Sequence, residues 1–255
     1  MVSQGSATTR ALILGGTSDA SLLAAAVARA GIHAVYSYGG RTRAPADQPL
    51  PIRIGGFGGV SGLADYIRRE AITHVIDATH PFAAEMSRNA VAACAETGTP
   101  LIALERAPWS KAPGDDWIEV VDVNAAVAAL PKEPTKVFLA IGRQHIAPFV
   151  MKPQHTYTLR FVDPPETTLP FPADVIVSRG PFALDGELEM MCTRGIMCIV
   201  ARNSGGDGAR AKIDAARMLG LPVIMISRPE LPERPRVESA AEIMQWLSHR
   251  TCLGA

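Results

Sequence analysis

Cysteines are few in this chain of 255 residues, and their spacing excludes the usual metal and redox motifs. The four are Cys94, Cys192, Cys198 and Cys252, and no two of them form a C-x-x-C pair. A chain of this length does not need cross-links to be stable, so we expect reduced thiols with a structural role.

An excess of charge of one sign is also missing. The 25 basic residues are balanced by 25 acidic ones. Divided at Trp109, the chain has nine arginines, no lysine and eight acidic residues in its first part, and sixteen basic and seventeen acidic residues in its second. Neither part has the basic excess that nucleic-acid binding usually shows, so we expect no nucleic-acid partner.

Long apolar runs and two common catalytic motifs are missing too. No stretch approaches the roughly 20 apolar residues of a membrane span. The first ten residues, MVSQGSATTR, lack the apolar centre of a signal peptide, so we expect a cytoplasmic protein without a membrane segment. There is no G-x-S-x-G elbow of serine hydrolases and no G-x-x-x-x-G-K-[ST] phosphate loop.

What the chain does have is a regular alternation of apolar runs and segments with helical periodicity. In the first part, strands are expected at 11–14, 33–38, 74–78 and 100–104, and helices at 18–31, 59–72 and 82–98. This alternation predicts an α/β fold in which helices flank both faces of a parallel sheet.

The segment APWSKAPGDDW, residues 107–117, interrupts the alternation with prolines, a glycine and charges, and we interpret it as a linker. A second α/β series follows, with strands expected at 136–142, 156–162, 173–179, 197–202 and 222–229 and a last helix at 239–249. The sequence therefore predicts two domains, residues 1–109 and 110–255.

One tripeptide occurs in both predicted domains. Pro81-Phe82-Ala83 and Pro181-Phe182-Ala183 each follow a strand and open a helix. This is compatible with a duplicated half, and equally with the general preference of proline for the first turn of helices.

The stretch ALILGGTSDA, residues 11–20, ends a predicted strand in a pair of glycines. Gly15 and Gly16 permit a sharp bend and the close approach of an anion. Thr17 or Ser18 can cap the following helix, whose free N–H groups and dipole favour a phosphate. The stretch departs from G-x-G-x-x-G because Thr17 stands in the place of the middle glycine, so a tight turn without a ligand is the alternative.

The end of the second predicted strand distinguishes between the two nicotinamide cofactors. NAD-binding folds carry an acidic residue there for the ribose diol, whereas this chain reads YSYGGRTR, residues 36–43, without an acid. The candidate ligands at this point are Ser37, Gly39, Arg41 and Arg43. Arginine can hold a 2′-phosphate with paired donors, so the sequence favours NADPH, with a solvated arginine loop as the alternative.

A second candidate site lies at the tip of the strand that Asp77 ends. Thr79, His80 and Pro81 follow it before the next helix, and such strand ends face the ligand crevice in doubly wound sheets. His80 could donate a hydrogen bond, bind a substrate carboxylate or transfer a proton, while Asp77 could orient it or bond only to backbone amides. His74, six residues earlier on the same strand, is no metal-ligand partner, so we expect no metal site.

A second glycine-rich turn, NSGGDG at residues 203–208, follows another predicted strand. Arg202, Arg210 and Lys212 supply positive charge around it, so it is a candidate anion site, with a flexible surface loop as the alternative. Further basic side chains stand at other strand ends: Arg143, His145 and Arg179.

Five sequence blocks, spread over residues 12–229, are distinctive together. They are LILGGTSDA, DATHPFA, ERAPW, RGPF and NSGG-x-G-x-x-x-K-x-x-AA-x-x-LG-x-PVIMI-x-RP. In these blocks the chain resembles the precorrin-6A reductase family of cobalamin biosynthesis. The family often has Thr-Lys before the Asn-Ser-Gly run, where this chain has Ala201-Arg202, which keeps the positive charge.

The resemblance implies two Rossmann-like domains with the active-site cleft between them. It also implies NADPH-dependent reduction of a double bond in the precorrin-6A macrocycle, a tetrapyrrole, to give precorrin-6B. The hydride step then needs mostly positioning, because the cofactor carries the reactive chemistry. His80 is expected to be a supporting proton donor or a substrate anchor.

The residues expected to bind the cofactor are Gly15, Gly16, Thr17, Ser18, Ser37, Gly39, Arg41, Arg43 and Thr79. Those expected to bind the substrate are Pro81, Phe82, Arg106, Arg143, Arg179, Arg202, Asn203, Ser204, Gly205 and Lys212. Arg228 is a further candidate cation at a strand end.

Two other functions are compatible with the sequence. One is another NADPH-dependent reductase or an epimerase, for instance on a nucleotide sugar, although that class carries a Tyr-x-x-x-Lys pair. None of the four tyrosines has a lysine four residues later: Tyr36, Tyr38, Tyr66 and Tyr157. The other is a non-catalytic, nucleotide-sensing module with the same two domains.

Overall fold

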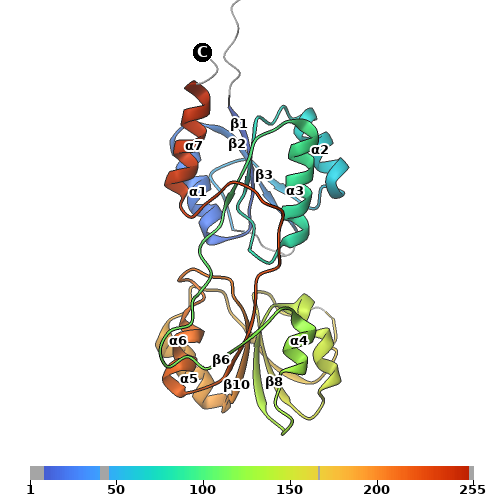
Figure 1. The fold of residues 1–255 in the computed structure, drawn as a ribbon, viewed down its shortest axis with the longest axis vertical. Helices are drawn as coiled ribbons and strands as arrows, with labels where there is room; N and C mark the ends of the chain where they lie inside the picture. The colour runs from blue at the N-terminus through green and yellow to red at the C-terminus, as the bar shows by residue number, and fades with distance from the viewer. Residues whose placement is uncertain (1–8, 41–45, 166, 253–255) are drawn as a thin grey trace, which may run out of the picture. The chain divides into compact units, whose positions relative to one another are not determined.

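The computed structural model describes residues 9–40, 46–165 and 167–252, and the chain folds into two compact units (Figure 1). Unit 1 holds the described residues up to Arg106 and those from Glu230 onward, and unit 2 holds Ala107–Pro229. The chain therefore passes from one unit to the other twice.

Unit 1 is built on a six-stranded parallel sheet. Its strands are β1 (Arg10–Leu14), β2 (His33–Tyr38), β3 (Ile52–Ile54), β4 (His74–Asp77), β5 (Leu101–Leu104) and β12 (Arg236–Val237). They lie in the order β3-β2-β1-β4-β5-β12. This is the strand order of dinucleotide-binding Rossmann folds, with β12 in the sixth place.

Helices cover both faces of this sheet (Figure 1). They are α1 (Ser18–Arg29) and α7 (Ala240–Cys252) on one face, and α2 (Gly59–Arg69) and α3 (Ala84–Thr97) on the other. Successive side chains of a strand point to opposite faces, so Ile13 packs with α1 and α7 whereas Leu12 and Leu14 pack with α2 and α3. Because both faces are buried, the strands read as continuous apolar runs.

Unit 2 contains a second six-stranded parallel sheet. Its strands are β6 (Trp117–Val120), β7 (Lys136–Ala140), β8 (Thr156–Phe161), β9 (Ala173–Val177), β10 (Cys198–Arg202) and β11 (Val223–Ile226). Its helices are α4 (Val123–Ala128), α5 (Leu184–Arg194) and α6 (Ala211–Leu219), with short 3-10 turns η1 (Arg143–His145) and η2 (Ala147–Met151). The order β9-β8-β7-β10-β11-β6 repeats that of unit 1, but the sixth strand comes first in the chain.

The predicted α/β fold with helix-covered parallel sheets is confirmed. Every predicted strand is present within two or three residues of its expected ends. The strands that the pattern missed are β3, β6 and β12, which have at most four residues and too few apolar positions to stand out in a sequence.

The structure divides the chain differently from the predicted domains 1–109 and 110–255. The first change of unit, after Arg106, lies close to the predicted one, but the segment from Glu230 returns to unit 1. There, β12 pairs with β5, and Ile243 and Leu247 of α7 are 0% and 1% exposed in the core that α1 lines. The returning segment adds the sixth strand of the sheet, and its helix α7 covers α1. Sequence periodicity can predict such a helix but cannot tell which of the two domains it packs against.

The two units share a topology, yet the repeated Pro-Phe-Ala tripeptide does not mark equivalent positions. Pro81 follows β4, which stands fourth in the shared order, whereas Pro181 follows the edge strand β9, which stands first, in the place of β3. The similarity of the units thus lies in strand order, and the tripeptide repeat follows the preference of proline for the turn before a helix.

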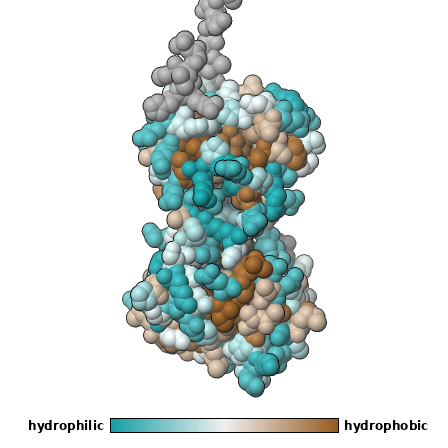
Figure 2. Space-filling view, in the orientation of Figure 1, coloured by the Kyte–Doolittle hydropathy of each residue, from teal (hydrophilic) through white to brown (hydrophobic). Residues whose placement is uncertain are grey.

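On the face drawn in Figure 2, hydrophilic and apolar residues mix on both units, and apolar residues gather in a strip on unit 2. Exposed apolar side chains include Leu22 in unit 1 and Val121 and Met218 in unit 2. Within the described residues, no helix has the length and apolar character needed to cross a membrane.

Truncating α7 tests its place in unit 1. Ile243→Ala should lower the free energy of unfolding by about 2–4 kcal/mol, because it leaves a cavity against α1. Denaturant unfolding measures this, and Gln245→Ala, at an exposed position of the same helix, should change stability by less than about 0.5 kcal/mol. Equal small effects of the two substitutions would contradict this packing.

Candidate functional site

The glycine turn predicted as a phosphate site lies between β1 and α1. Gly16 has φ +114°, a value that favours glycine. Thr17 is the N-cap of α1, where its Oγ1 accepts the N–H of Ala20 at 3.1 Å. Of the two expected caps, Thr17 and Ser18, the structure uses Thr17, which leaves Ser18 in the first turn of the helix.

Gly15 is required by the tyrosine packed beneath the turn. A Cβ at this position would lie 2.1 Å from Cζ of Tyr36, a fully buried residue. The Tyr36 hydroxyl accepts the Gly16 N–H at 2.9 Å, and burial raises the pKa of this phenol, so it stays protonated at neutral pH. Tyr36 therefore fixes the turn from below, and the amides of the first turn of α1 are the ones that a helix leaves available to an anion.

The turn is joined directly to the exit of β4. Oγ1 of Thr17 donates to the carbonyl oxygen of Ala78 at 3.0 Å. β1 and β4 are the neighbours between which the strand order reverses, and ligands of such sheets bind at the carboxyl ends of these two strands. The glycine turn and Thr79, predicted separately as cofactor ligands, therefore lie next to each other at the strand ends.

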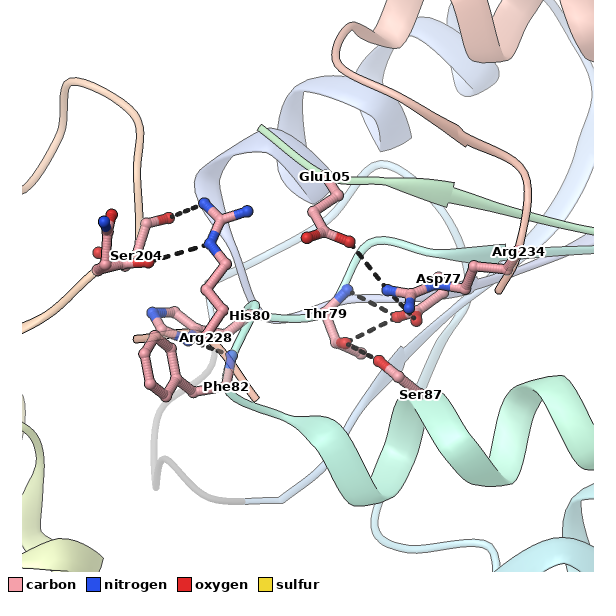
Figure 3. A network of polar contacts seen from close by, with 10 residues as sticks. Asp77, Thr79, His80, Phe82, Ser87, Glu105, Ser204, Arg228 and Arg234 are labelled. Atoms are coloured by element: carbon pink, nitrogen blue, oxygen red, sulfur yellow. Dashed lines mark hydrogen bonds and ion pairs between the residues drawn. The ribbon is translucent and has the colours of Figure 1, made fainter. Parts of the chain in front are cut away.

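The carboxylate of Asp77 shapes the loop that carries His80 (Figure 3). Its Oδ1 accepts hydrogen bonds from Thr79 N at 3.2 Å and Thr79 Oγ1 at 2.7 Å, and Thr79 Oγ1 lies 3.5 Å from Ser87 Oγ on α3. Of the two roles considered for Asp77, bonding at the turn is the one that these contacts support. Asp77 is only 2% exposed, so its charge needs a buried partner.

That partner is Arg234, which precedes β12 and was not singled out in the sequence. Arg234 Nη2 lies 3.0 Å from Glu105 Oε2 and 3.5 Å from Asp77 Oδ2 (Figure 3). The side chains of Asp77 and Arg234 are 1% and 9% exposed. Arg234 thus links the ends of β4 and β5 to the segment that returns from unit 2. The sequence alone does not indicate this link, because the three residues are far apart in the chain.

His80 is half buried, and its ring has a defined hydrogen bond. The Phe82 N–H donates to His80 Nδ1 at 3.2 Å (Figure 3). On a neutral ring this assigns the proton to Nε2, because Nδ1 acts as acceptor. His80 can therefore present a donor through Nε2, which is the geometry needed by a substrate anchor or a proton donor.

The end of β2 holds Ser37 as predicted, together with an arginine that the sequence analysis missed. The Ser37 carbonyl accepts the Gly15 N–H at 2.9 Å, and its hydroxyl lies 3.4 Å from Nη1 of Arg53 on β3. Gly39 follows β2 at the surface, and Arg41 and Arg43 lie outside the described residues. Arg53 stands in the sequence PIRIGG, residues 51–56, where β3 is too short to be predicted as a strand.

Arg106, expected to bind substrate, lies close to the glycine turn. Its Nη1 is 2.8 Å from Oδ2 of Asp19 in the first turn of α1. The structure thus brings this cation to the candidate cofactor side of unit 1, where it balances the acid at the helix N-terminus. Pro81 and Phe82 belong to the His80 loop of the same unit.

In unit 2, the NSGG block is joined to Ala107 and Trp109, the last part of the ERAPW block. The Asn203 amide bonds both ways to the backbone of Trp109, accepting from its N at 2.7 Å and donating to its O at 2.8 Å. The Trp109 indole N–H donates to Gly206 O at 2.8 Å. A Cβ on Gly205 would lie 2.0 Å from the Ala107 carbonyl oxygen, so the two segments touch where only glycine fits.

Two of the expected cations hold this loop in place. Lys212 is buried, with Nζ 2.5 Å from Ala209 O and 4.9 Å from the centre of the Trp109 ring. Arg228 donates from Nε to Asn203 O at 3.0 Å and from Nη2 to Ser204 O at 3.1 Å. These contacts give both residues a structural role in shaping residues 203–206.

Two of the remaining predicted cations, Arg143 and Arg202, stand at the strand ends where the order of sheet 2 reverses, between β7 and β10. Arg143 follows β7 and donates to Thr167 Oγ1 at 2.5 Å, and Arg202 ends β10, with Nη2 3.6 Å from the Cβ position of Gly142. Arg179 follows the edge strand β9 and is exposed. Its neighbour Gly180 would place a Cβ 3.4 Å from Gly208 O, so the RGPF and NSGG blocks are adjacent.

Two of the described cysteines, Cys94 and Cys198, are buried. Burial raises the pKa of Cys94 to about 12 and that of Cys198 to about 11, so both are neutral thiols at physiological pH. Cys192 is exposed on α5.

Known proteins resemble this chain over nearly its whole length. The sequence profile of the precorrin-6x reductase CbiJ/CobK family matches residues 10–248. A precorrin-6A reductase of Rhodobacter capsulatus is 58% identical over 241 residues, covering 94% of this chain and 96% of that protein. A precorrin-6A reductase of Mycobacterium tuberculosis is 40% identical over 242 residues, covering 94% and 98%.

A solved structure described as CobK precorrin-6A reductase has a TM-score of 0.91 and 57% identity, covering 94% of this chain and 96% of that one. The family profile and these relatives span both units, including the returning segment with β12. This chain therefore belongs to the precorrin-6x reductase CbiJ/CobK family.

Proposed function

We propose that this protein reduces a double bond of the precorrin-6A macrocycle, giving precorrin-6B, with NADPH as the hydride donor. The observation that carries the proposal is 58% identity to a precorrin-6A reductase over 94% of the chain. Unit 1, with its Rossmann strand order and glycine turn, supports a dinucleotide as the second reactant.

The residues at the strand ends of unit 1 fit such a cofactor. Gly15 leaves room for Tyr36 beneath the turn, Thr17 caps the helix N-terminus that favours a phosphate, and no acid stands at the end of β2 to select an unphosphorylated ribose. In this proposal Gly16, Ser18, Ser37, Gly39 and Thr79 complete the cofactor site, together with Arg41 and Arg43 as sequence predictions. When bound, NADPH supplies a hydride, and the protein contributes binding and orientation.

A precorrin is a flat ring with several carboxylates, so its site needs apolar contact and cations. In our proposal unit 2 supplies Arg143, Arg179 and Arg202 for the carboxylates. Asn203, Ser204 and Gly205 provide backbone shaped by Trp109, Lys212 and Arg228. Pro81 and Phe82, as apolar contacts, and Arg106, as a further cation, remain predictions from the sequence.

His80 holds a proton at Nε2 in this scheme. Its Nδ1 is engaged by the Phe82 amide, so the ring cannot turn freely, and Nε2–H is the group offered to the substrate. That group anchors an acceptor of the macrocycle or gives a proton to the carbon next to the one that is reduced.

The decisive assay mixes the purified protein, NADPH and precorrin-6A and follows the loss of NADPH absorbance. Consumption of NADPH together with formation of a reduced corrinoid supports the proposal. NADPH binding without consumption would instead identify a nucleotide-sensing module.

Two substitutions separate the chemical and the structural role of His80. His80→Ala removes the whole ring, whereas His80→Asn keeps an acceptor for the Phe82 N–H and removes only the Nε2 donor. Both should lower kcat roughly 10- to 100-fold, because the donor is lost, with NADPH affinity unchanged. Steady-state kinetics and cofactor titration measure this, and full turnover by His80→Asn would exclude Nε2 from the reaction.

The glycine turn gives a separate prediction. Gly15→Ala places a methyl group 2.1 Å from the Tyr36 ring, so Tyr36 or the turn must move. We expect NADPH affinity to fall at least about tenfold and stability to fall by about 1–3 kcal/mol through overpacking. Gly186→Ala, where nothing lies within 4 Å, is the matched control. Unchanged NADPH affinity in Gly15→Ala would remove this turn from the cofactor site.

A further inference from the structure

Arg53 is a cation at the end of β3 to which neither the motifs nor the resemblance gave a role. In the sheet register it lies directly beside Ser37 of β2, and its Nη1 is 3.4 Å from the Ser37 hydroxyl. The two residues therefore occupy neighbouring strands at one point of the sheet edge.

The guanidinium of Arg53 is held in one orientation. Nη1 donates to Gly55 O at 2.5 Å, Nη2 donates to Gly56 O at 2.7 Å, and Cζ lies 3.7 Å from the centre of the Phe57 ring. With the Ser37 contact, these bonds engage three of the five N–H groups of the side chain. The group is thus preorganised and keeps donors for a ligand.

The positive charge of Arg53 is not neutralised by the described part of the chain. Among the described residues, no carboxylate lies within ion-pair distance of it, whereas Arg10, Arg68 and Arg69 in the same unit are each paired with an acid. Burial lowers the pKa of Arg53, and the like charge of Arg69 lowers it further. A partly desolvated cation without a counter-charge is stabilised by an anionic ligand.

The position of this cation indicates which anion it meets. In Rossmann-type sheets the end of the second strand faces the adenosine ribose, where an acid binds the 2′-hydroxyl of NAD and an arginine accommodates the 2′-phosphate of NADP. Here the end of β2 has Ser37 and no acid, with Arg53 beside it. We propose that Arg53 and Ser37 bind the 2′-phosphate of the dinucleotide and so select NADPH over NADH.

This inference rests on the proposed cofactor site, and it deepens that proposal by naming the selecting pair within the described residues. It is tested by binding alone, with no corrinoid present. Its failure is therefore distinguishable from failure of the proposed reaction, which is read from NADPH consumption with precorrin-6A.

The test uses Arg53→Met in the full-length protein, with dissociation constants for NADPH and NADH measured from the fluorescence of the reduced nicotinamide. NADPH should bind about 10- to 100-fold more weakly, the loss expected for a charge-assisted hydrogen-bond pair. NADH, which lacks the 2′-phosphate, should change by less than about threefold. Arg53→Lys should fall between the wild type and Arg53→Met, because it keeps the charge without the paired donors.

Arg69→Met is the matched control. The guanidinium carbons of Arg53 and Arg69 both lie 5.3 Å from the centre of the Tyr66 ring, but Arg69 is exposed and paired with Glu70. The Arg69→Met substitution removes one positive charge from the same region and leaves the Arg53–Ser37 hydrogen bond in place. Both cofactors should bind this control as they bind the wild type.

A second readout uses 2′,5′-ADP and 5′-ADP as competitors of the cofactor. The wild type should prefer 2′,5′-ADP, and Arg53→Met and Ser37→Ala should each reduce that preference. Equal weakening of NADPH and NADH in Arg53→Met would assign Arg53 to loop structure only and overturn the proposal. Unchanged binding of both cofactors, or a wild type that does not discriminate between them, would overturn it as well.

Discussion

The parallel direction of all strands in each sheet is the constraint on which the sites depend. It brings the carboxyl ends of the strands to one edge, so loops far apart in the chain become neighbours. In unit 1 this edge joins the glycine turn after β1, Ser37 on β2, Arg53 on β3 and the His80 loop after β4. In unit 2 it gathers the loops after β7, β9 and β10, which carry most of the remaining basic candidates. The strand order reverses between β1 and β4 in unit 1 and between β7 and β10 in unit 2. In sheets of this kind, ligands bind at the carboxyl ends of the two strands between which the order reverses.

Glycine and arginine residues shape the loops at these strand ends in two different ways. Gly15 and Gly205 are placed where a neighbouring ring or carbonyl leaves no space for a Cβ, so each turn packs tightly against its support. Arg228 and Arg234 are mostly structural, because their donors hold a loop and a pair of buried acids. Arg53 differs in that the described acids do not neutralise it, and a charge of that kind is better explained by a ligand than by stability.

The sequence predicted the strand–helix alternation because strands buried on both faces leave long apolar runs. It also predicted residues of the glycine turn and the His80 loop, where residue type and position after a strand carry the information. It did not predict the return of residues 230–252 to unit 1 or the role of Arg234, since both depend on contacts between distant segments. Arg53 escaped for a different reason: β3 has three residues, too few for a period to be visible. Lys212 was predicted as a cation for the substrate, and only the structure showed its amine turned onto Trp109.

The sixth strand of each sheet comes from a different end of its unit's sequence, and this affects the order in which the two sheets can form on the ribosome. β6 is translated before the other strands of its sheet, so unit 2 has its whole sheet once β11 has emerged. Unit 1 starts first but waits for β12, and until then the edge of β5 lacks its neighbour and α1 lacks the cover of α7. The later half of the polypeptide thus has all its strands available before the earlier half does, and until β12 emerges the nascent first half has an unpaired edge that is open to wrong partners.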